Sequence, residues 1–368
     1  MIIYWRNKMI EVVVVLDYNP QKVPQDMFPQ LCEKAYLPLI KTCNELMLPV
    51  VHGISGRVIE RLHTQRQEEI IESLKSTVAE EQAVIATKGF SSAALTQLSK
   101  TEILHQLGFA HEVNKETFGK STNIFMPQEG WIDVYMPGIL KKAGFKCTLL
   151  SGNSVVNCHK KSPKSTTSIH QIRGLKNTHI HAISSYTDGL VSSETKIDDL
   201  FTGRITSKDL TNELFLLFDK VEKPILLFHV NAELPFFQEG PRSAIQRFRF
   251  FIEGLQSTGN FHFSLPIPLI ERAENEIELG PALLQDKRLQ QLAQQARDII
   301  VEKEKKDPKA LTIRKAWKNL LFAHDYCFTQ EYLSTLDPTD EIQYKNVCDL
   351  YIQACERAQL AIKNASEA

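Results

Sequence analysis

The chain has 368 residues, of which 43% are hydrophobic and 24% are charged, and its formal net charge is −1. This length is enough for one large domain with a smaller appendage. The near-neutral charge gives no electrostatic reason to expect nucleic acid or an anionic membrane as a partner, and no apolar run reaches the roughly 18–20 residues that cross a membrane.

The beginning of the chain and its cysteines predict a cytoplasmic protein. The first segment, MIIYWRNKMIEVVVVLDY, is interrupted by Arg6, Lys8 and Glu11 and lacks a small-residue cleavage site. We therefore interpret it as a first strand and not as a signal peptide. The seven cysteines are an odd number and form no CxxC pair. Reduced thiols in the core are expected from this usage.

Seven short apolar runs predict the strands of a parallel sheet. The first, EVVVVLDY, lacks polar alternation, as expected of a strand buried on both faces. Helix-like segments separate several of the runs, for example residues 24–45 and 57–79. This alternation predicts a barrel-like α/β fold. The runs are residues 11–18, 48–55, 83–89, 122–127, 146–151, 178–184 and 223–230.

From about Leu269 the pattern becomes helical, with apolar pairs at i,i+3 and i,i+4 spacing and no strand candidate. We therefore divide the chain into a barrel, residues 1–265, and a helical bundle, residues 266–368. The polar stretch 151–177, with a small basic cluster, is predicted to be an exposed loop over the barrel opening.

Glu129 is a first candidate for chemistry, because functional groups of parallel barrels lie at the C-terminal ends of the strands. It follows an apolar run that Pro127 ends, and Trp131 beside it is an aromatic platform of the kind that stacks on a sugar ring. Three interpretations of Glu129 are open. It could be a general acid, a nucleophile, or a residue that stabilises the N-terminus of a helix beginning near Asp133.

Glu233 is a second candidate. The apolar run that contains His229 leads directly into Asn231 and then Glu233. Retaining glycosidases use two carboxyl groups about 5–5.5 Å apart, one as nucleophile and one as general acid/base. Glu129 and Glu233 could form such a pair. The alternative is an ion pair of Glu233 with Arg242 or Arg247.

The order of these motifs resembles glycoside hydrolase family 57. Residues 126–130 (MPQEG), followed by residues 140–144 (LKKAG), are similar to the family's nucleophile turn, and residues 229–233 (HVNAE) are similar to its acid/base motif. Residues 48–62 and 312–328 resemble its second strand and its late helix. The resemblance implies an incomplete (β/α)7 barrel followed by a C-terminal helical bundle. It also implies an oligosaccharide or polysaccharide partner, above all an α-glucan, and no cofactor.

The resemblance implies roles for single residues as well. Glu129 takes the nucleophile position, Asn231 takes the acid/base position, and Glu233 completes the catalytic set. No metal ligands are implied. The expected substrate-binding residues are Asp17, Tyr18, Ser92, Trp131, His229 and Asp325.

The departures from the family pattern affect catalysis. Asn231 stands where the family has an acid/base Asp, and an amide cannot deliver a proton to a glycosidic oxygen. Residues 16–20 (LDYNP) replace a His-rich motif, and Ser91 and Ser92 replace a further His. General acid catalysis contributes about 10²–10⁴-fold, so hydrolysis should be strongly impaired unless Asp17, Asp133 or Glu233 donates the proton.

Three functional hypotheses remain open. The first is a carbohydrate-active enzyme, retaining if active, with impaired or altered catalysis. The second is a non-catalytic pseudoenzyme that binds a glycan or a protein partner. The third is a metal-dependent deacetylase-like hydrolase that uses His179 and His181, which share one side of a strand, with Asp17. The alternative for these two histidines is that neighbouring side chains satisfy both imidazoles.

Overall fold

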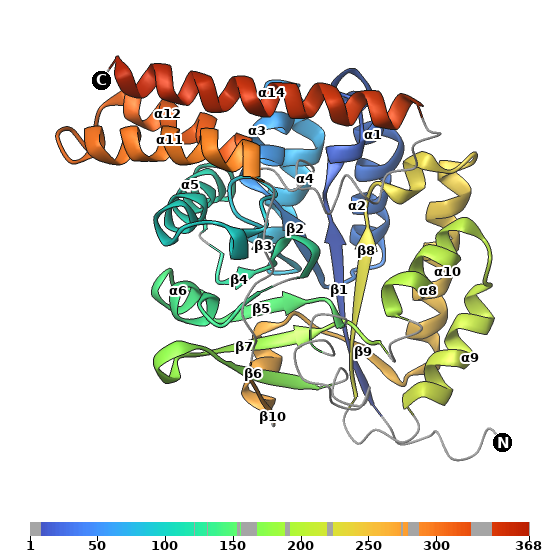
Figure 1. Ribbon diagram of the computed structural model, residues 1–368. Helices are drawn as coiled ribbons and strands as arrows, with labels where there is room; N and C mark the ends of the chain where they lie inside the picture. Colours follow the sequence, from blue (N-terminus) through green and yellow to red (C-terminus); the bar gives the residue numbers. More distant parts are fainter. Residues whose placement is uncertain are drawn as a thin grey trace.

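A ten-stranded sheet forms the centre of the molecule, and helices cover it (Figure 1). The computed structural model describes residues 9–120, 122–130, 132–152, 155, 168–187, 192–218, 224–273, 275–278, 287–324 and 341–367. All seven predicted runs form strands. They are β1 (Ile10–Asp17), β2 (Val50–Ile54), β3 (Ala83–Thr87), β4 (Ile124–Phe125), β5 (Cys147–Leu150), β7 (His179–Ser184) and β8 (Ile225–Asn231).

The register of the strands creates one functional rim. Strands β7, β5, β4, β3, β2, β1 and β8 follow one another in the sheet, and each pair is parallel. Asp17 at the end of β1 is in register with Gly53 on β2 and Asn231 on β8. The order has two ends, so the barrel is open, and the predicted incomplete (β/α) barrel is confirmed.

Three strands were not predicted. β6 (Ile169–Arg173) pairs antiparallel with β7 and parallel with β10 (Asn275–Glu278), while β9 (Phe261–Phe263) pairs with the start of β1. The predicted exposed loop 151–177 is therefore wrong at β6, and the absence of strands after Leu269 is wrong at β10. The segments IHQIR and NEIE are short and polar, and so they carry too few apolar residues to give a strand signal.

The helices of the barrel part cover the outside of the sheet (Figure 1). The first predicted helical segment consists of α1 (Phe28–Leu31), a π-helical turn (Cys32–Tyr36) and α2 (Leu37–Glu45). The second consists of two helices, α3 (Gly56–Thr64) and α4 (Glu68–Ala79). The others are α5 (Lys100–Phe118), α6 (Met136–Lys142), α8 (Ser193–Thr202), α9 (Ser207–Phe218) and α10 (Pro241–Thr258).

The C-terminal part is helical, as predicted. It contains α11 (Lys287–Glu304), α12 (Leu311–Ala323) and the long α14 (Glu341–Ser366), which runs over the ends of α1 and α3 (Figure 1). The boundary between residues 265 and 266 stays a prediction. Among the helices that the structure describes, none combines the length and the hydropathy required to span a bilayer.

Candidate active site

A chain of charged side chains crosses the rim where β1, β3 and β8 end. Lys88 follows β3 and places its Nζ 2.6 Å from Oδ1 of Asp17. Oδ2 of Asp17 lies 2.9 Å from Nε2 of His229, and Nδ1 of His229 lies 3.5 Å from Oε1 of Glu194 at the start of α8. The side chain of Lys88 is only 1% exposed. Such a buried charge is tolerated because opposite charges contact it.

These contacts fix the protonation states of the rim. Burial opposes ionisation of Asp17, but Lys88 and His229 lower its pKa to about 2. Burial favours a neutral His229, but its hydrogen bonds to Asp17 and Glu194 raise its pKa to about 10. At neutral pH the rim therefore carries an ionised Asp17 between two cations, Lys88 and His229.

Glu233 belongs to a second, deeper group. It is 4% exposed, and its Oε1 accepts hydrogen bonds from the backbone N–H of Asn19, at 2.7 Å, and from the hydroxyl of Tyr36. The π-helical turn after α1 delivers Tyr36, and turns of this kind are frequent at functional sites. Burial, helped by the charge of Asp17, raises the pKa of Glu233 to about 7, against the effect of the Tyr36 and Asn19 bonds.

The ion pair of Glu233 with Arg242 or Arg247, the alternative considered for this residue, is not observed in the described part of the chain. Arg247 donates from Nε to the carbonyl of Leu200 at 3.0 Å. The carboxyl group of Glu233 is held by neutral donors instead, which is why burial dominates its pKa.

Asn231 and Tyr18 lie beside these groups. Asn231 is exposed at the end of β8, and its Oδ1 accepts the backbone N–H of Glu233 at 3.0 Å. Tyr18 is buried, with its hydroxyl 3.0 Å from Nδ1 of His52 and its ring edge-on to Tyr36 at 4.8 Å. Asn231 is therefore solvent-exposed at the rim, whereas Tyr18 is buried.

The turn that carries Glu129 requires a glycine at position 130. Residues Gln128–Gly130 form a single 3-10 turn, and Gly130 has φ +71. A Cβ on Gly130 would collide with the backbone nitrogen of Ser151, so only glycine fits this approach. The side chains of Glu129, Trp131 and Asp325 lie outside the part of the chain that the structure describes.

The helix after this turn begins later than predicted and is stabilised by Asp133. Helix α6 begins at Met136, and Oδ1 of Asp133 accepts the N–H groups of Tyr135 and Met136 at 3.0 and 3.1 Å. Asp133 therefore stabilises the helix N-terminus, and a contribution of Glu129 there stays a prediction.

The remaining candidates are distributed differently. Ser91 exchanges two 2.8 Å hydrogen bonds with Gln106, and Ser92 beside it is buried. His179 and His181 lie in the first half of β7, away from the rim, and Nε2 of His179 is 3.4 Å from Glu276. Within the described residues, no group of three or more His, Cys, Asp or Glu side chains is arranged to hold a metal ion.

Four members of the site were not predicted: Lys88, Glu194, Tyr36 and His52. Lys88 lies near the end of the third predicted run, residues 83–89, so the strand-end rule that selected Glu129 would also have selected it. Tyr36 and Glu194 lie on helices, where the sequence shows only ordinary helical spacing. Their approach to the rim depends on tertiary packing.

An open, mostly parallel (β/α) barrel with polar and charged side chains at the C-terminal rim defines a class, the (β/α)-barrel proteins that act at their strand ends. The sequence matches the model of glycosyl hydrolase family 57 over residues 3–187. This match spans half of the chain, so the protein belongs to glycoside hydrolase family 57, a carbohydrate-active family, and the resemblance found in the sequence is confirmed.

Solved structures show the same fold. The 4-alpha-glucanotransferase from Thermococcus litoralis is similar with a TM-score of 0.69 at 12% identity, over 94% of this chain and 59% of the other. The GH57-type branching enzyme from Pyrococcus horikoshii has a TM-score of 0.69 at 11% identity, with 97% and 88% covered. The alpha-amylase AmyC from Thermotoga maritima has a TM-score of 0.65 at 9% identity, with 97% and 96% covered.

The chain thus spans about three fifths of the length of the glucanotransferase, 59%, and most of the length of the other two proteins. None of the curated proteins matches it at a significant level. Identities this low establish the fold alone, and so the activity has to be argued from the site.

Proposed function

We propose that this protein acts on α-glucan chains through Glu129 as nucleophile, with general acid catalysis impaired at Asn231. The observation that carries the proposal is the end of β8, where a neutral amide is in register with Asp17 and its Oδ1 accepts the N–H of Glu233. The similar folds of a 4-alpha-glucanotransferase, a branching enzyme and an alpha-amylase support an α-glucan as the substrate class.

The proposed chemistry is a double displacement. The Glu129 carboxylate attacks the anomeric carbon, the glycosidic bond breaks, and the leaving oxygen requires a proton. Asn231 has none to give. Water then attacks the glycosyl ester and restores the carboxylate. Without a donor, the first step depends on how well the leaving group carries negative charge.

Glu233 is the best remaining proton donor among the described candidates. Asp17, with a pKa of about 2 and two cationic partners, is ionised at neutral pH. Burial raises the pKa of the Asp133 carboxyl, but this group accepts two N–H groups at the start of α6. The pKa of Glu233, about 7, leaves a substantial protonated fraction at neutral pH. Glu233 therefore supplies slow acid assistance in this proposal.

Intact-mass spectrometry after incubation with α-glucosyl fluoride tests the nucleophile. Fluoride leaves without much protonation, so this substrate bypasses the lesion at Asn231. We expect a mass increase of one glucosyl group, and its absence in Glu129→Gln. Neither adduct nor fluoride release, in a protein that still binds maltooligosaccharides, would contradict catalysis and favour the non-catalytic glycan-binding alternative.

Restoring the carboxyl group tests the acid. We expect Asn231→Asp to raise the hydrolysis rate of an unactivated maltooligosaccharide by about 10²-fold, because general acid catalysis is worth about 10²–10⁴-fold. Asn177→Asp, at an exposed turn residue, makes the same chemical change away from the rim and should leave the rate unaltered. Equal rates for wild type and Asn231→Asp at equal stability would contradict the assignment of Asn231 as the lesion.

A further inference from the structure

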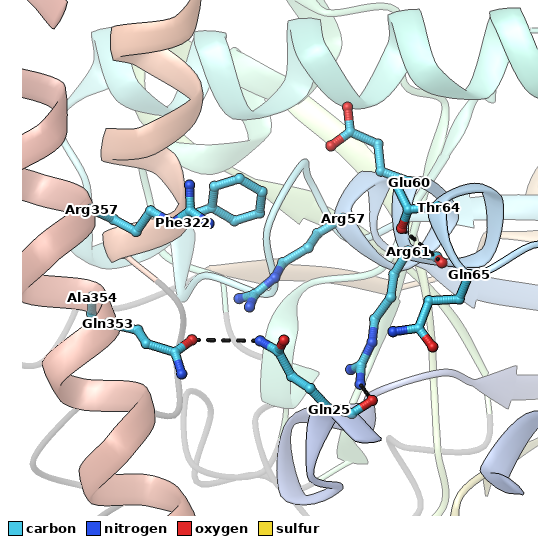
Figure 2. Close-up of a pocket in the computed structure, with 10 residues that line it drawn as sticks. All are labelled: Gln25, Arg57, Glu60, Arg61, Thr64, Gln65, Phe322, Gln353, Ala354 and Arg357. Atoms are coloured by element: carbon cyan, nitrogen blue, oxygen red, sulfur yellow. Dashed lines mark hydrogen bonds between the residues drawn. The ribbon is translucent and has the colours of Figure 1, made fainter. Parts of the chain in front are cut away.

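A second polar pocket lies outside the rim. It has a volume of about 310 Å³ and lies between α3, the segment before α1, and the helices α12 and α14 (Figure 2). Three arginines, three glutamines and one aromatic ring dominate its wall. They are Arg57, Arg61, Arg357, Gln25, Gln65, Gln353 and Phe322. None of these residues belongs to the candidate active site.

The arginines are held around the cavity by aromatic faces. The guanidinium carbons of Arg57 and Arg357 lie 4.9 and 5.4 Å from the centroid of the same ring, that of Phe322. Figure 2 shows Arg57 extending from α3 and Arg357 extending from α14 toward this ring. Two positive charges from opposite walls are thus brought to one side of the pocket.

Arg61 forms the other side. Its guanidinium stacks at 3.9 Å on the ring of Phe28 and donates from Nη2 to the carbonyl of Gln25 at 3.2 Å (Figure 2). Burial, together with the positive charge of Arg57, lowers the pKa of Arg61 to about 10. It remains cationic at neutral pH, so the fold keeps like charges close together.

The described residues that line the pocket include more guanidinium groups than carboxylates. Among the described residues that line the pocket, the one carboxylate is Glu60, and it is paired with Lys318. In the described part of the wall, three guanidinium groups thus stand against one carboxylate that already has a partner, and a bound anion would interact favourably with them. Neighbouring guanidinium groups repel one another, and an anion placed between them removes this cost.

We propose that this pocket binds a small molecule through a phosphate or pyrophosphate group. Guanidinium groups present planar pairs of N–H donors that match phosphate oxygens in bidentate geometry. The side-chain amides of Gln25 and Gln353, 3.5 Å apart, offer donors and acceptors to a hydroxyl group or a further oxygen. The cavity is at the small end of ligand sites, which suits pyrophosphate or a hexose phosphate and excludes a long chain.

The site joins two parts of the molecule. Arg57 and Arg61 come from α3 next to the barrel, while Arg357 and Gln353 come from α14. A ligand that contacts both should hold α14 against the barrel. Because it binds only the folded chain, it should also raise the melting temperature as its concentration increases.

Calorimetric titration of the full chain tests the proposal with four probes: pyrophosphate, inorganic phosphate, glucose 6-phosphate and glucose. We expect saturable binding of at least one phosphate compound, a rise in melting temperature with the same compound, and no binding of glucose here. Tight pyrophosphate with weak glucose 6-phosphate would identify a free polyanion as the ligand, and the reverse order would identify a sugar ester.

Two variants locate the binding. Arg357→Gln changes an exposed residue of α14, and Arg57→Gln changes the facing wall. Each should weaken phosphate binding about tenfold or more, as expected for loss of one charge-assisted contact. Arg204→Gln is the matched control, since it removes the same charge from a side chain that is 75% exposed and pairs with Asp199.

Three results would overturn the proposal. The first is no saturable binding of any phosphate probe up to millimolar concentration. The second is equal weakening by Arg204→Gln, which would mean attraction to overall charge. The third is unchanged affinity in a folded Arg357→Gln protein. Because α-glucosyl fluoride reacts at the rim, its outcome is independent of these results.

Discussion

Lys88 keeps its ammonium group in the protein interior, 2.6 Å from Asp17. Removing one partner of a buried ion pair leaves an uncompensated charge and costs about 3–5 kcal/mol. We expect Lys88→Met, which retains the length of the side chain without its charge, to lower the free energy of unfolding by about this amount in urea denaturation.

The matched control for Lys88 is a lysine in a solvent-exposed pair. Lys41 lies 2.6 Å from Glu69, and the two side chains are 51% and 64% exposed. Such pairs contribute about 0–1 kcal/mol, so Lys41→Met should change stability little. Similar losses in Lys88→Met and Lys41→Met would contradict the role of Lys88 in a compensated buried network.

At the residue scale, the sequence located part of the rim because strand ends and family motifs can be recognised. Glu233 was selected because it follows an apolar run, whereas Asp17 and His229 were implied by the family resemblance, and all three lie in the interacting groups of the rim. Their partners could not be read in the same way. That Lys88 pairs with Asp17, and that a π-helical turn aims Tyr36 at Glu233, are consequences of three-dimensional packing and not of spacing along the chain.

At the scale of elements, Glu102 connects three helices. Its carboxylate completes the capping box of α5 with Ser99, and it lies 2.9 Å from both Arg297 of α11 and His324 after α12. Burial opposes its ionisation, but His324, Ser99 and Arg297 lower the pKa of Glu102 to about 2. One carboxylate thus stabilises the start of α5 and its contact with the C-terminal helices.

We expect Glu102→Ala to lower the free energy of unfolding by about 3–5 kcal/mol, because it removes one member of a buried charged group. Ser99→Ala removes only the cap and should cost about 1 kcal/mol. Urea denaturation of both variants separates the two contributions. If Ser99→Ala lowered the free energy of unfolding as much as Glu102→Ala, the contact of Glu102 with α11 and α12 would contribute no measurable stability.

The strands differ in how clearly the sequence predicts them. β1 and β8, buried and in parallel pairs, are continuous apolar runs such as VVVVL, and the prediction found them. β6 and β10 carry His170, Gln171 and Glu276 among few apolar residues, and they pair with each other on the far side of β7. Their identity as strands comes from the partner and not from the local pattern.

At the scale of the whole molecule, Glu233 and His229 of the rim, together with Asp198 on α8, make stability depend on pH. The pKa of Glu233 rises from 4.5 to about 7, that of Asp198 from 3.8 to about 6, and that of His229 from 6.5 to about 10. A group whose pKa is raised by folding contributes stability that is complete below its unfolded pKa and is lost as the pH passes its folded pKa. These three groups should therefore remove stability in a lower step, between about pH 4 and 7, and in an upper step, between about pH 6.5 and 10, whereas His52, whose pKa burial lowers from 6.5 to about 3, adds stability as the pH rises between those two values.

Two variants assign these steps, with the free energy of unfolding measured in urea at intervals from about pH 4 to pH 10.5. Glu233→Gln should reduce the lower step to the part due to Asp198 and preserve the upper one, because a neutral amide does not titrate. His229→Gln should remove the upper step, since no imidazolium then loses its bonds to Asp17 and Glu194. Glu239→Gln, an exposed change close to Glu233 in the sequence, is the control and should retain both steps. An upper step that persists in His229→Gln would mean that a different group holds the proton between Asp17 and Glu194. The positive charge assigned to His229 would then be wrong.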